Sequence, residues 1–251
     1  MELVVRAEAV GLTDPGERAH NEDGFGTFPE LGLFVVADGL GGGSRGSPAA
    51  VAIEAIAARY AEGPAGLDAL AAAIQAGNAA ILALAEREPS FHGCGATVAA
   101  LALAGDRALT AHAGDCRAYR RRDGSLRQLT EDHSLLRDYA KIRRLSAKEM
   151  DAFPHKNVVT RALGLIADID VDLRIGPARA DDLYLLATDG LHAKLPWERI
   201  DEILSGATPR ELASYRESPR VDLETMAGRL VASTNAMKGT DNITCLLVRV
   251  S

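Results

Sequence analysis

Three aspartates stand at the ends of apolar runs, where their carboxylates could act on one ligand. Asp38 and Asp189 each follow a run that is typical of a β-strand, and a glycine follows each of them. Asp241 stands just before a third such run. If the third strand is antiparallel to the other two, its start lies beside their ends. The three carboxylates would then meet at one edge of a sheet.

Carboxylates held this close repel one another, and the repulsion raises their pKa unless a cation neutralises them. Their hard oxygen atoms suit Mg²⁺ or Mn²⁺ better than a thiophilic metal. Gly39 allows a sharp turn after Asp38 and lets its own carbonyl oxygen approach an ion. Asp-Gly pairs also occur in ordinary turns. Two strands that end alike, together with the mirrored start at Asp241, favour a divalent-metal site.

A further acidic pair, Glu22 and Asp23, precedes the run that leads to Asp38, and Arg18 stands four residues before Glu22. A guanidinium binds two oxygens of a phosphate at once, so Arg18 beside a metal site could hold an anionic substrate. The alternative is a structural salt bridge between Arg18 and a neighbouring carboxylate.

The elements that must position these residues are short strands and longer helices. Apolar or alternating runs predict strands at residues 33–37, 96–104, 107–113, 117–121, 183–187 and 243–250. Helical spacing predicts helices at residues 48–62, 67–87, 135–145, 197–204 and 223–236. Asp123 and Gly124 predict a tight hairpin. Strands joined by tight turns, with helices inserted in pairs, indicate an α+β fold with antiparallel sheets rather than a doubly wound dinucleotide-binding fold.

Composition limits the class of protein. The chain is 47% hydrophobic and no linker divides it, so we predict a single domain over residues 1–251. The formal charge of −7, from 35 acidic and 28 basic residues, argues against a nucleic-acid-binding protein with a broad cationic face. The basic cluster of Arg120, Arg121 and Arg122 is typical of a solvated strand end, although a ligand-binding role stays open.

The cysteines and the apolar runs bear on the cellular compartment. Cys94, Cys116 and Cys245 are widely spaced within apolar runs, which indicates buried free thiols and a reducing compartment. Polar residues interrupt the run at residues 69–85, and the first residues lack the apolar core of a signal peptide. We therefore expect a cytoplasmic protein that does not associate with a membrane.

Besides residues 18–23, short motifs follow one another through nearly the whole chain. They are 13–16 (TDPG), 36–42 (VADGLGG), 95–97 (GAT), 113–117 (AGDCR), 129–134 (LTEDHS), 157–164 (NVVTRALG), 188–191 (TDGL) and 241–244 (DNIT). In their order and approximate spacing they resemble the metal-dependent protein phosphatases of type 2C, particularly the compact bacterial members.

This resemblance implies an α+β fold, a four-layer α-β-β-α sandwich in which helices flank two central antiparallel sheets. It also implies a metal centre that holds two ions, Mn²⁺ or Mg²⁺, and a weaker third ion. Asp38 would bridge the two ions. Asp189 and Asp241 would hold one of them, and the carbonyl oxygen of Gly39 would help to hold the other.

The remaining site residues also follow from the resemblance. Glu22 and Asp23 match an acidic pair that contacts metal directly or through water. Asp132 matches a residue that supports the third ion together with Asp189, and Arg18 matches the phosphate-binding arginine. Other residues are expected to support the fold or the site without touching substrate: Asp115 and Arg117 as a fold-holding pair, Asn242 and Thr244 beside Asp241, and His133 and His192.

The activity implied by the resemblance is hydrolysis of phosphoserine and phosphothreonine on proteins by a metal-activated water, reversing a bacterial Ser/Thr kinase. The partners would be phosphorylated proteins and the kinase itself, with the chain a monomer. One alternative is a phosphatase dedicated to a single regulatory partner of the anti-anti-sigma type. Another is an inactive phosphoprotein-binding module, against which the complete set of carboxylates argues.

Two further features concern the leaving group and the substrate. Leu40 stands where many eukaryotic members have a histidine that could protonate the leaving group, and Leu40→His should add a histidine-like limb to the pH–rate profile. Residues 134–156 match the family's flap over the site. The cations of this segment either bind acidic phosphoproteins or form the solvated face of an amphipathic helix. They are Arg137, Lys141, Arg143, Arg144 and Lys148.

Overall fold

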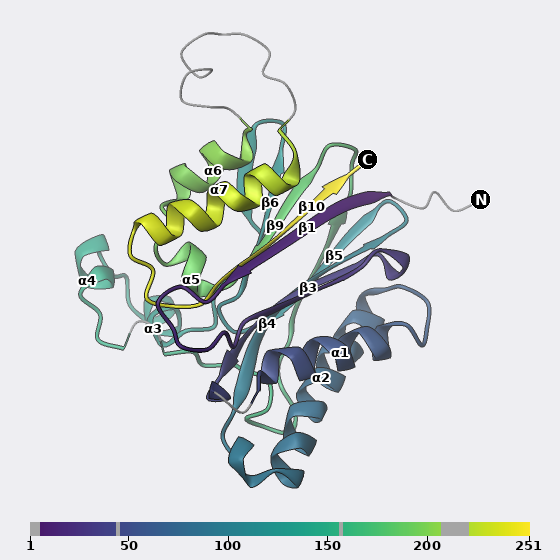
Figure 1. Cartoon of the computed structure of the whole chain (residues 1–251), viewed down its shortest axis with the longest axis vertical. Coiled ribbons are helices and arrows are strands. Elements are labelled where there is room, and N and C mark those ends of the chain that lie inside the picture. Colours follow the sequence, from purple (N-terminus) through teal and green to yellow (C-terminus); the bar gives the residue numbers. More distant parts are fainter. Residues whose placement is uncertain (1–5, 44–45, 156–157, 207–220) are drawn as a thin grey trace.

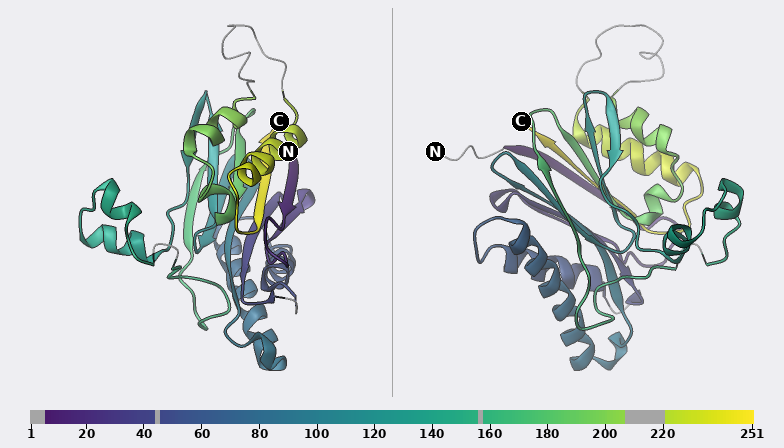
Figure 2. Two further views of the ribbon diagram at one scale, coloured as in Figure 1. Left: turned by 60° about the vertical axis from the view of Figure 1, so that its left-hand side comes forward. Right: turned by 180° about the vertical axis from the view of Figure 1, so that it is seen from behind.

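The computed structural model describes residues 6–43, 46–155, 158–206 and 221–251. Two five-stranded antiparallel sheets lie face to face, and helices cover the outer face of each, as Figures 1 and 2 show. The four-layer α+β sandwich predicted from the sequence is therefore confirmed.

The first sheet has the strand order β1-β10-β9-β6-β7. Its strands are β1 (Ala7–Asp14), β10 (Ile243–Val250), β9 (Leu183–Ala187), β6 (Arg117–Arg122) and β7 (Ser125–Gln128). The second sheet has the order β2-β3-β4-β5-β8. Its strands are β2 (Gly24–Phe28), β3 (Leu33–Leu40), β4 (Gly95–Ala104), β5 (Arg107–Ala113) and β8 (Asp172–Pro177).

Helices α1 (Pro48–Tyr60) and α2 (Leu67–Arg87) cover the second sheet. Helices α5 (Asp189–His192), α6 (Trp197–Leu204) and α7 (Leu223–Ala236) cover the first sheet. Helices α3 (Leu135–Ile142) and α4 (Ala147–Asp151) lie in the segment predicted to be the flap, beside the end of the sandwich near α5. Lys156, the last residue of that predicted segment, lies outside the described residues.

Alternating side chains of the central strands fill different layers of the core. In β3, Val35 packs towards α1 and α2, whereas Phe34 and Val36 pack between the two sheets. In β10, Leu247 packs towards α7 and Leu246 packs between the sheets. Strands buried on both faces read as continuous apolar runs, which is why these strands were predicted from the sequence.

Each predicted strand and helix is present, with small differences at the ends. The hairpin at Asp123 and Gly124 is confirmed, because both residues have positive φ, 50° and 76°, between β6 and β7. β3 continues through Leu40, so Asp38 lies inside the strand rather than after it. Asp189 is the first residue of helix α5 rather than part of a turn. Strands β1, β2, β7 and β8 and helices α4 and α5 were not predicted.

Among the described residues, helix α2 is the one helix whose length and apolar composition would allow it to cross a membrane. Polar residues nevertheless interrupt its apolar run. Its polar residues have structural partners. Asn78 donates hydrogen bonds to the carbonyl oxygens of Ile166 (2.9 Å) and Ala167 (3.1 Å) and accepts one from the Gly164 N–H (2.7 Å). These bonds tie α2 to the chain segment that leads into β8.

Candidate metal centre

The end of β9 and the start of β10 bring two of the predicted aspartates together. The Thr188 N–H donates to the Thr244 carbonyl oxygen (3.1 Å), and the Thr244 N–H donates to Thr188 Oγ1 (3.0 Å). A Cβ on Gly190 would overlap the carbonyl oxygen of Asn242, so glycine is required where α5 begins against the start of β10. Burial raises the pKa of Asp189, and the charge of Asp241 raises it further. The predicted antiparallel arrangement is therefore present for β9 and β10. The expectation of a single sheet edge was wrong, because β3, which carries Asp38, belongs to the other sheet.

Asp38 joins this pair from the other sheet, where it lies opposite Thr97 of β4. Burial raises the pKa of Asp38 well above its ordinary value, and nearby carboxylates raise it further. Those carboxylates belong to Asp23, Asp189, Asp115 and Asp241. The structure thus gathers five aspartates at one end of the sandwich, and we call these five residues the carboxylate cluster.

Asp23 is held in the cluster by the β9–β10 pair. Thr188 donates its hydroxyl hydrogen to Asp23 Oδ2 at 2.8 Å. Burial raises the pKa of Asp23 to about 6, although hydrogen bonds from Thr188 and Thr244 oppose the increase. The sequence predicted Asp23 near the site, and in the structure the hydrogen bond from Thr188 links it to the end of β9.

Glu22 and Gly39 meet through the backbone. The Gly39 N–H donates to the Glu22 carbonyl oxygen at 3.2 Å, and the Ser47 hydroxyl donates to the same oxygen. A Cβ at residue 39 would lie 2.6 Å from that oxygen, so close approach of the two chains requires glycine there. Glu22 Oε1 accepts a hydrogen bond from the Gly43 N–H at 2.6 Å. Glu22 thus lies beside Gly39 of strand β3.

Arg18 lies against the exposed side of the cluster. Its Nη2 donates to Asp241 Oδ2 at 2.9 Å, and its Nε donates to the Thr240 carbonyl oxygen at 2.8 Å. The Arg18 side chain is 56% exposed, so it is open to solvent while it is paired with Asp241. The salt bridge considered from the sequence is present, and it places a guanidinium beside the carboxylates.

The expected pair between Asp115 and Arg117 was wrong. Arg117 donates instead to both carboxylate oxygens of Asp132, from Nε to Oδ1 at 2.7 Å and from Nη2 to Oδ2 at 2.6 Å. Burial and the charges of Asp189 and Asp132 raise the pKa of Asp115 to about 7. Asp115 follows Gly114 just after strand β5, so the strand-end pattern used for the other aspartates would also have found it.

Asp132 differs from the carboxylate cluster because a cation already compensates it. Burial alone would raise the pKa of Asp132, but the hydrogen bonds and charge of Arg117 hold it below the ordinary value. Asp132 lines a cavity of about 230 Å³ together with Asp115 and Asp189. Its predicted role at a third ion stays a prediction, although Asp132 and Asp189 do face the same cavity.

His192 supports the cluster from inside the protein. Its Nε2 lies 2.9 Å from the carbonyl oxygen of Asp115. Burial and the neighbouring charge of Arg117 lower the pKa of His192 to about 3. The imidazole is therefore neutral at neutral pH and positions the Asp115 backbone.

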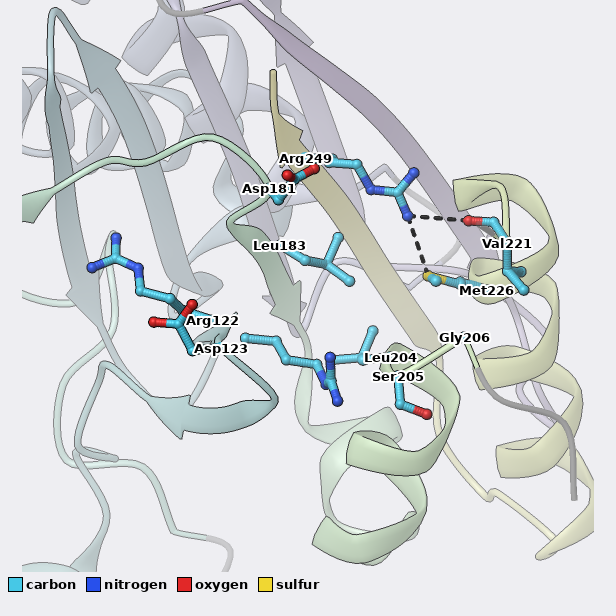
Figure 3. Close-up of a pocket in the computed structure, with 11 residues that line it drawn as sticks. Arg122, Asp123, Asp181, Leu183, Leu204, Ser205, Gly206, Val221, Met226 and Arg249 are labelled. Carbon is cyan, nitrogen blue, oxygen red and sulfur yellow. Dashed lines mark hydrogen bonds between the residues drawn. The ribbon is translucent and has the colours of Figure 1, made fainter. Parts of the chain in front are cut away.

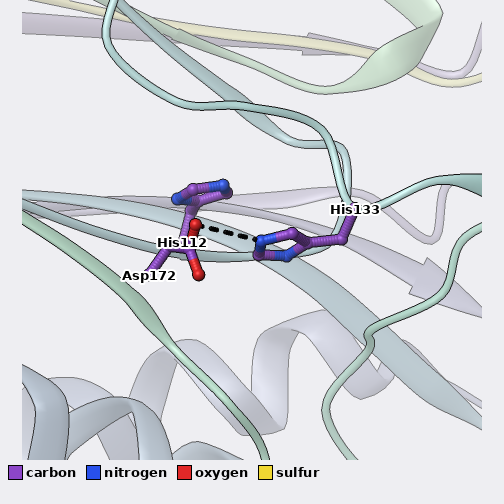
Figure 4. Close-up of side chains that lie close together, drawn as sticks. All are labelled: His112, His133 and Asp172. Atoms are coloured by element: carbon purple, nitrogen blue, oxygen red, sulfur yellow. Dashed lines mark ion pairs between the residues drawn. The ribbon is translucent and has the colours of Figure 1, made fainter. Parts of the chain in front are cut away.

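A second group of metal-type side chains lies elsewhere. One ligand atom from each of His112, His133 and Asp172 lies within 4.8 Å of the others (Figure 4). The guanidinium of Arg161 already occupies this group, because its Nη1 lies 2.8 Å from Asp172 Oδ1 and 3.2 Å from His133 Nε2. The two imidazoles stack nearly in parallel, 4.6 Å apart, so one ion cannot lie in both ring planes. This group therefore does not fit a metal.

A cavity of about 200 Å³ lies between the loop after β6 and helices α6 and α7, away from the cluster (Figure 3). Leu183, Leu204 and Met226 line it together with Arg249, which donates to the carbonyl oxygen of Val221 at 3.1 Å. No member of the carboxylate cluster lines this cavity. It is separate from the chemistry described above.

The donor set of the carboxylate cluster fits divalent cations. Among the ion pairs of the described residues, a cation reaches only one of its five members, through the contact of Arg18 with Asp241. Four partly buried carboxylates without a salt bridge among the described residues would be protonated or neutralised by bound metal near neutral pH. Oxygen donors without nearby thiolates favour hard ions such as Mg²⁺ or Mn²⁺.

Comparison with known proteins agrees with this chemistry. The family profile for protein phosphatase 2C matches residues 16–220. The serine/threonine phosphatase Stp of Listeria monocytogenes is 34% identical over 247 residues, which cover 94% of this chain and 93% of the relative. The serine/threonine protein phosphatase PstP of Mycobacterium tuberculosis is 34% identical over 93% of this chain and 43% of its own length. This chain belongs to the protein phosphatase 2C family.

The solved structures give the same result for the fold. The crystal structure of the PstP catalytic domain in complex with two manganese ions superposes with a TM-score of 0.81 at 33% identity, covering 98% of this chain and 99% of that one. Metal ions are thus part of the chemistry of this family.

Proposed function

We propose that this chain is a protein serine/threonine phosphatase that hydrolyses phosphoserine and phosphothreonine with the help of divalent metal bound by the carboxylate cluster. The observation that carries this proposal is the convergence of Asp38, Asp189 and Asp241, from both sheets, on one solvent-accessible end of the sandwich. The family and the names of its relatives support the same activity.

The metal-binding roles are assigned by the donor set. Asp38 interacts electrostatically with the other four carboxylates of the cluster, so we propose that it would serve both ions. Asp23, Asp189, Asp115 and Asp241 would complete the carboxylate ligands. Two ions, Mn²⁺ or Mg²⁺, are proposed because the PstP catalytic domain is described with two manganese ions. When bound, such ions activate water for attack on phosphorus and neutralise charge on the transferred group.

The protein's own groups bind and orient the phosphate. Arg18 offers a guanidinium at the exposed side of the cluster, and this group can donate in parallel to two oxygens of a phosphate. Its bond to the Thr240 carbonyl fixes the direction of the side chain. A substrate phosphate would compete with Asp241 for Nη2 of Arg18.

The leaving group receives no proton from a side chain at residue 40. Leu40 pairs with Gly95 at the end of β3 and carries no titratable group. His192 is neutral and buried, and it bonds to the backbone of Asp115. We therefore propose that solvent or bound water protonates the serine or threonine alkoxide.

The substrates we propose are proteins phosphorylated by a Ser/Thr kinase, and the kinase is itself a candidate. We also propose a cytoplasmic enzyme, because the three cysteines are free and buried. We further propose that it is monomeric and acts in signalling. The deciding experiment is release of phosphate from a phosphothreonine peptide with and without Mn²⁺. Wild-type activity that depends on Mn²⁺ and disappears in Asp38→Ala is the expected result. Folded wild-type protein that releases no phosphate with any divalent ion would refute the proposal.

A further inference from the structure

The space between the two sheets is apolar at its centre but cationic at one margin. In β6, Arg120 and Arg122 lie on the same face as Ala118, which packs in the core between the sheets. Arg127 of β7 pairs with Arg120 across the hairpin and shares that face. Three arginines therefore lie on the inner face of the first sheet, at the edge that β6 and β7 form.

The second sheet contributes a fourth arginine at the same margin. Arg174 of β8 pairs with Thr110 of β5, two residues from Ala108, which packs in the core between the sheets. β7 and β8 are the outermost strands of their sheets, so no further strand of the described residues closes this side. A cavity of about 270 Å³ opens there, and we call it the arginine groove. The arginines that line it are Arg120, Arg122, Arg127 and Arg174.

Among the described residues, one carboxylate forms an ion pair with these guanidiniums, and it pairs only with Arg122. Asp182 accepts hydrogen bonds from Arg122 and also from the N–H of Arg179 and the hydroxyl of Tyr184, so its oxygens are fully engaged. Among the ion pairs of the described residues, none involves Arg120, Arg127 or Arg174. An excess of positive charge therefore collects here in a chain whose formal net charge is −7.

The arrangement also leaves hydrogen-bond donors without acceptors. Nε of Arg120 is buried and has no partner among the described residues. A buried donor without an acceptor costs free energy that a bound anion would recover. Arg127 and Arg174 are exposed. Within the described part of the chain, Arg174 donates one hydrogen bond, from Nη1 to the carbonyl oxygen of Leu129, at 3.4 Å. The donor set fits a tetrahedral oxyanion such as a phosphate group.

The arginine groove leads towards the metal centre. A neighbouring cavity of about 330 Å³ shares Thr110, Leu129 and Arg174 with it and continues to Gln128. The Gln128 side-chain amide lies 3.4 Å from Asp132 Oδ1, at the edge of the cavity beside the carboxylate cluster. An extended chain could therefore lie along this margin and reach both places.

The acidic residues along this path do not block an anionic chain. Glu131 pairs with Lys141 at 3.3 Å, and Asp172 pairs with Arg161 at 2.8 Å. The side chains of Leu173 and Ile175 on β8 are 39% and 52% exposed. They lie on the face of β8 opposite Arg174, because they pair with Ala111 and Leu109, which pack in the outer core. The outer edge of β8 pairs with no strand of the described residues, so it offers backbone hydrogen bonds to a peptide.

We propose that the arginine groove binds a second phosphate on the same substrate polypeptide whose first phosphate lies at the metal centre. This inference rests on the proposed function and specifies its substrate class: the preferred substrates are segments that carry at least two phosphates.

The kinetic test compares phosphothreonine peptides that differ only in a second phosphoserine, placed at increasing distances on either side. At one range of spacings, the second phosphate should lower KM about tenfold, equivalent to about 1.4 kcal/mol. The double variant Arg127→Gln/Arg174→Gln should lose that advantage. Arg87→Gln, which removes an exposed charge on α2, should keep it. An advantage that persists in the double variant, or is absent in the wild type at every spacing, overturns the proposal.

A binding test separates this inference from the proposed function. Fluorescence anisotropy would measure the Kd of a labelled peptide that carries two non-hydrolysable phosphonates. If the wild type hydrolyses nothing, yet the double variant binds this peptide about tenfold more weakly, the groove stands and the phosphatase assignment fails. If hydrolysis is normal and both proteins bind equally, the groove assignment fails. Binding of inorganic phosphate at Arg127 and Arg174 without any gain for the peptide would assign the groove to free anions and overturn the substrate proposal.

Discussion

Arg117 donates two hydrogen bonds to Asp132, at 2.7 and 2.6 Å, and thereby keeps one carboxylate beside the metal centre charged and compensated. Asp23, Asp38, Asp115 and Asp189 are partly buried and form no salt bridge with any described residue. The end of the sandwich therefore contains two electrostatic environments: one that is complete within the protein, and one that requires added cations.

Removal of the Arg117 guanidinium should leave the buried carboxylate of Asp132 uncompensated. Arg117→Met should lower the free energy of unfolding by about 3 kcal/mol, because both side chains are mostly buried. Urea denaturation at neutral pH would measure the change. The double variant Arg117→Met/Asp132→Leu should recover much of the loss, and a single variant as stable as the wild type would contradict this account.

Metal binding should reverse the pH dependence of stability. In the folded protein without metal, the pKa of Asp23 is raised to about 6 and that of Asp115 to about 7. The unfolded chain releases these protons near pH 4, so the folded state binds more protons between about pH 4 and about pH 7. The free energy of unfolding should fall as the pH rises through this window.

Added Mn²⁺ should displace those protons, so its stabilising effect should increase with pH over the same range. Urea denaturation in EDTA and in Mn²⁺, at about pH 5 and about pH 7.5, would measure both trends. Metal-free protein that gains stability across the window would show that Asp23 and Asp115 are already ionised and compensated.

Asp115→Asn distinguishes a residue of the carboxylate cluster from a fold-holding residue. Loss of one negative charge should stabilise the metal-free protein by about 1 to 2 kcal/mol and weaken Mn²⁺ binding about tenfold. Denaturation in EDTA and calorimetric titration with Mn²⁺ would measure these effects. Asp106→Asn, at an exposed turn residue, should change neither quantity. If Asp115→Asn destabilised the metal-free protein instead, Asp115 would be a fold-holding residue.

Gly190 fixes the distance between two aspartates. A Cβ there would overlap the carbonyl oxygen of Asn242, so Gly190→Ala should separate Asp189 from Asp241. We expect a loss of about 3 kcal/mol in the free energy of unfolding, together with weaker Mn²⁺ binding. Gly228→Ala, in α7 with open space around it, should instead be neutral or stabilising by up to about 1 kcal/mol. Similar effects of the two substitutions would refute the steric argument.

The sequence predicted the elements that are buried on one or both faces, because burial requires a periodic apolar pattern. It did not predict β8, whose residues are mostly exposed, or β1, whose side chains alternate weakly in burial. These strands form because the neighbouring strands offer unpaired hydrogen-bonding edges, which local sequence does not reveal. Helix α5 was missed for another reason: Asp189 and Gly190 are typical turn residues, and tertiary packing against β10 decides their conformation.

The same distinction applies to the site. Aspartates at strand ends can be grouped by the topology that they imply, so the sequence alone predicts that Asp38, Asp189 and Asp241 lie together. The predicted partner of Arg117 was wrong. Asp115 is its neighbour in the sequence, but the fold brings Asp132 to 2.6 Å from its guanidinium. Whether Arg117 pairs with Asp115 or with Asp132 depends on the direction in which its side chain leaves β6. The local sequence does not reveal this direction.

The flap segment allows a last prediction, on substrate docking. Arg143 and Arg144 are exposed after α3, and neither forms an ion pair with any other described residue. Arg143→Glu/Arg144→Glu should raise KM for an acidic phosphoprotein about tenfold, because it reverses charge on a surface beside the metal centre. KM for a small aryl phosphate should stay the same, since that substrate does not reach the flap. Steady-state kinetics with both substrates, and with Arg87→Glu as a matched distant reversal, would measure the difference. Equal changes for the two substrates would mean that the substitutions disturb the site itself, and the two arginines would then belong to the solvated face of the segment.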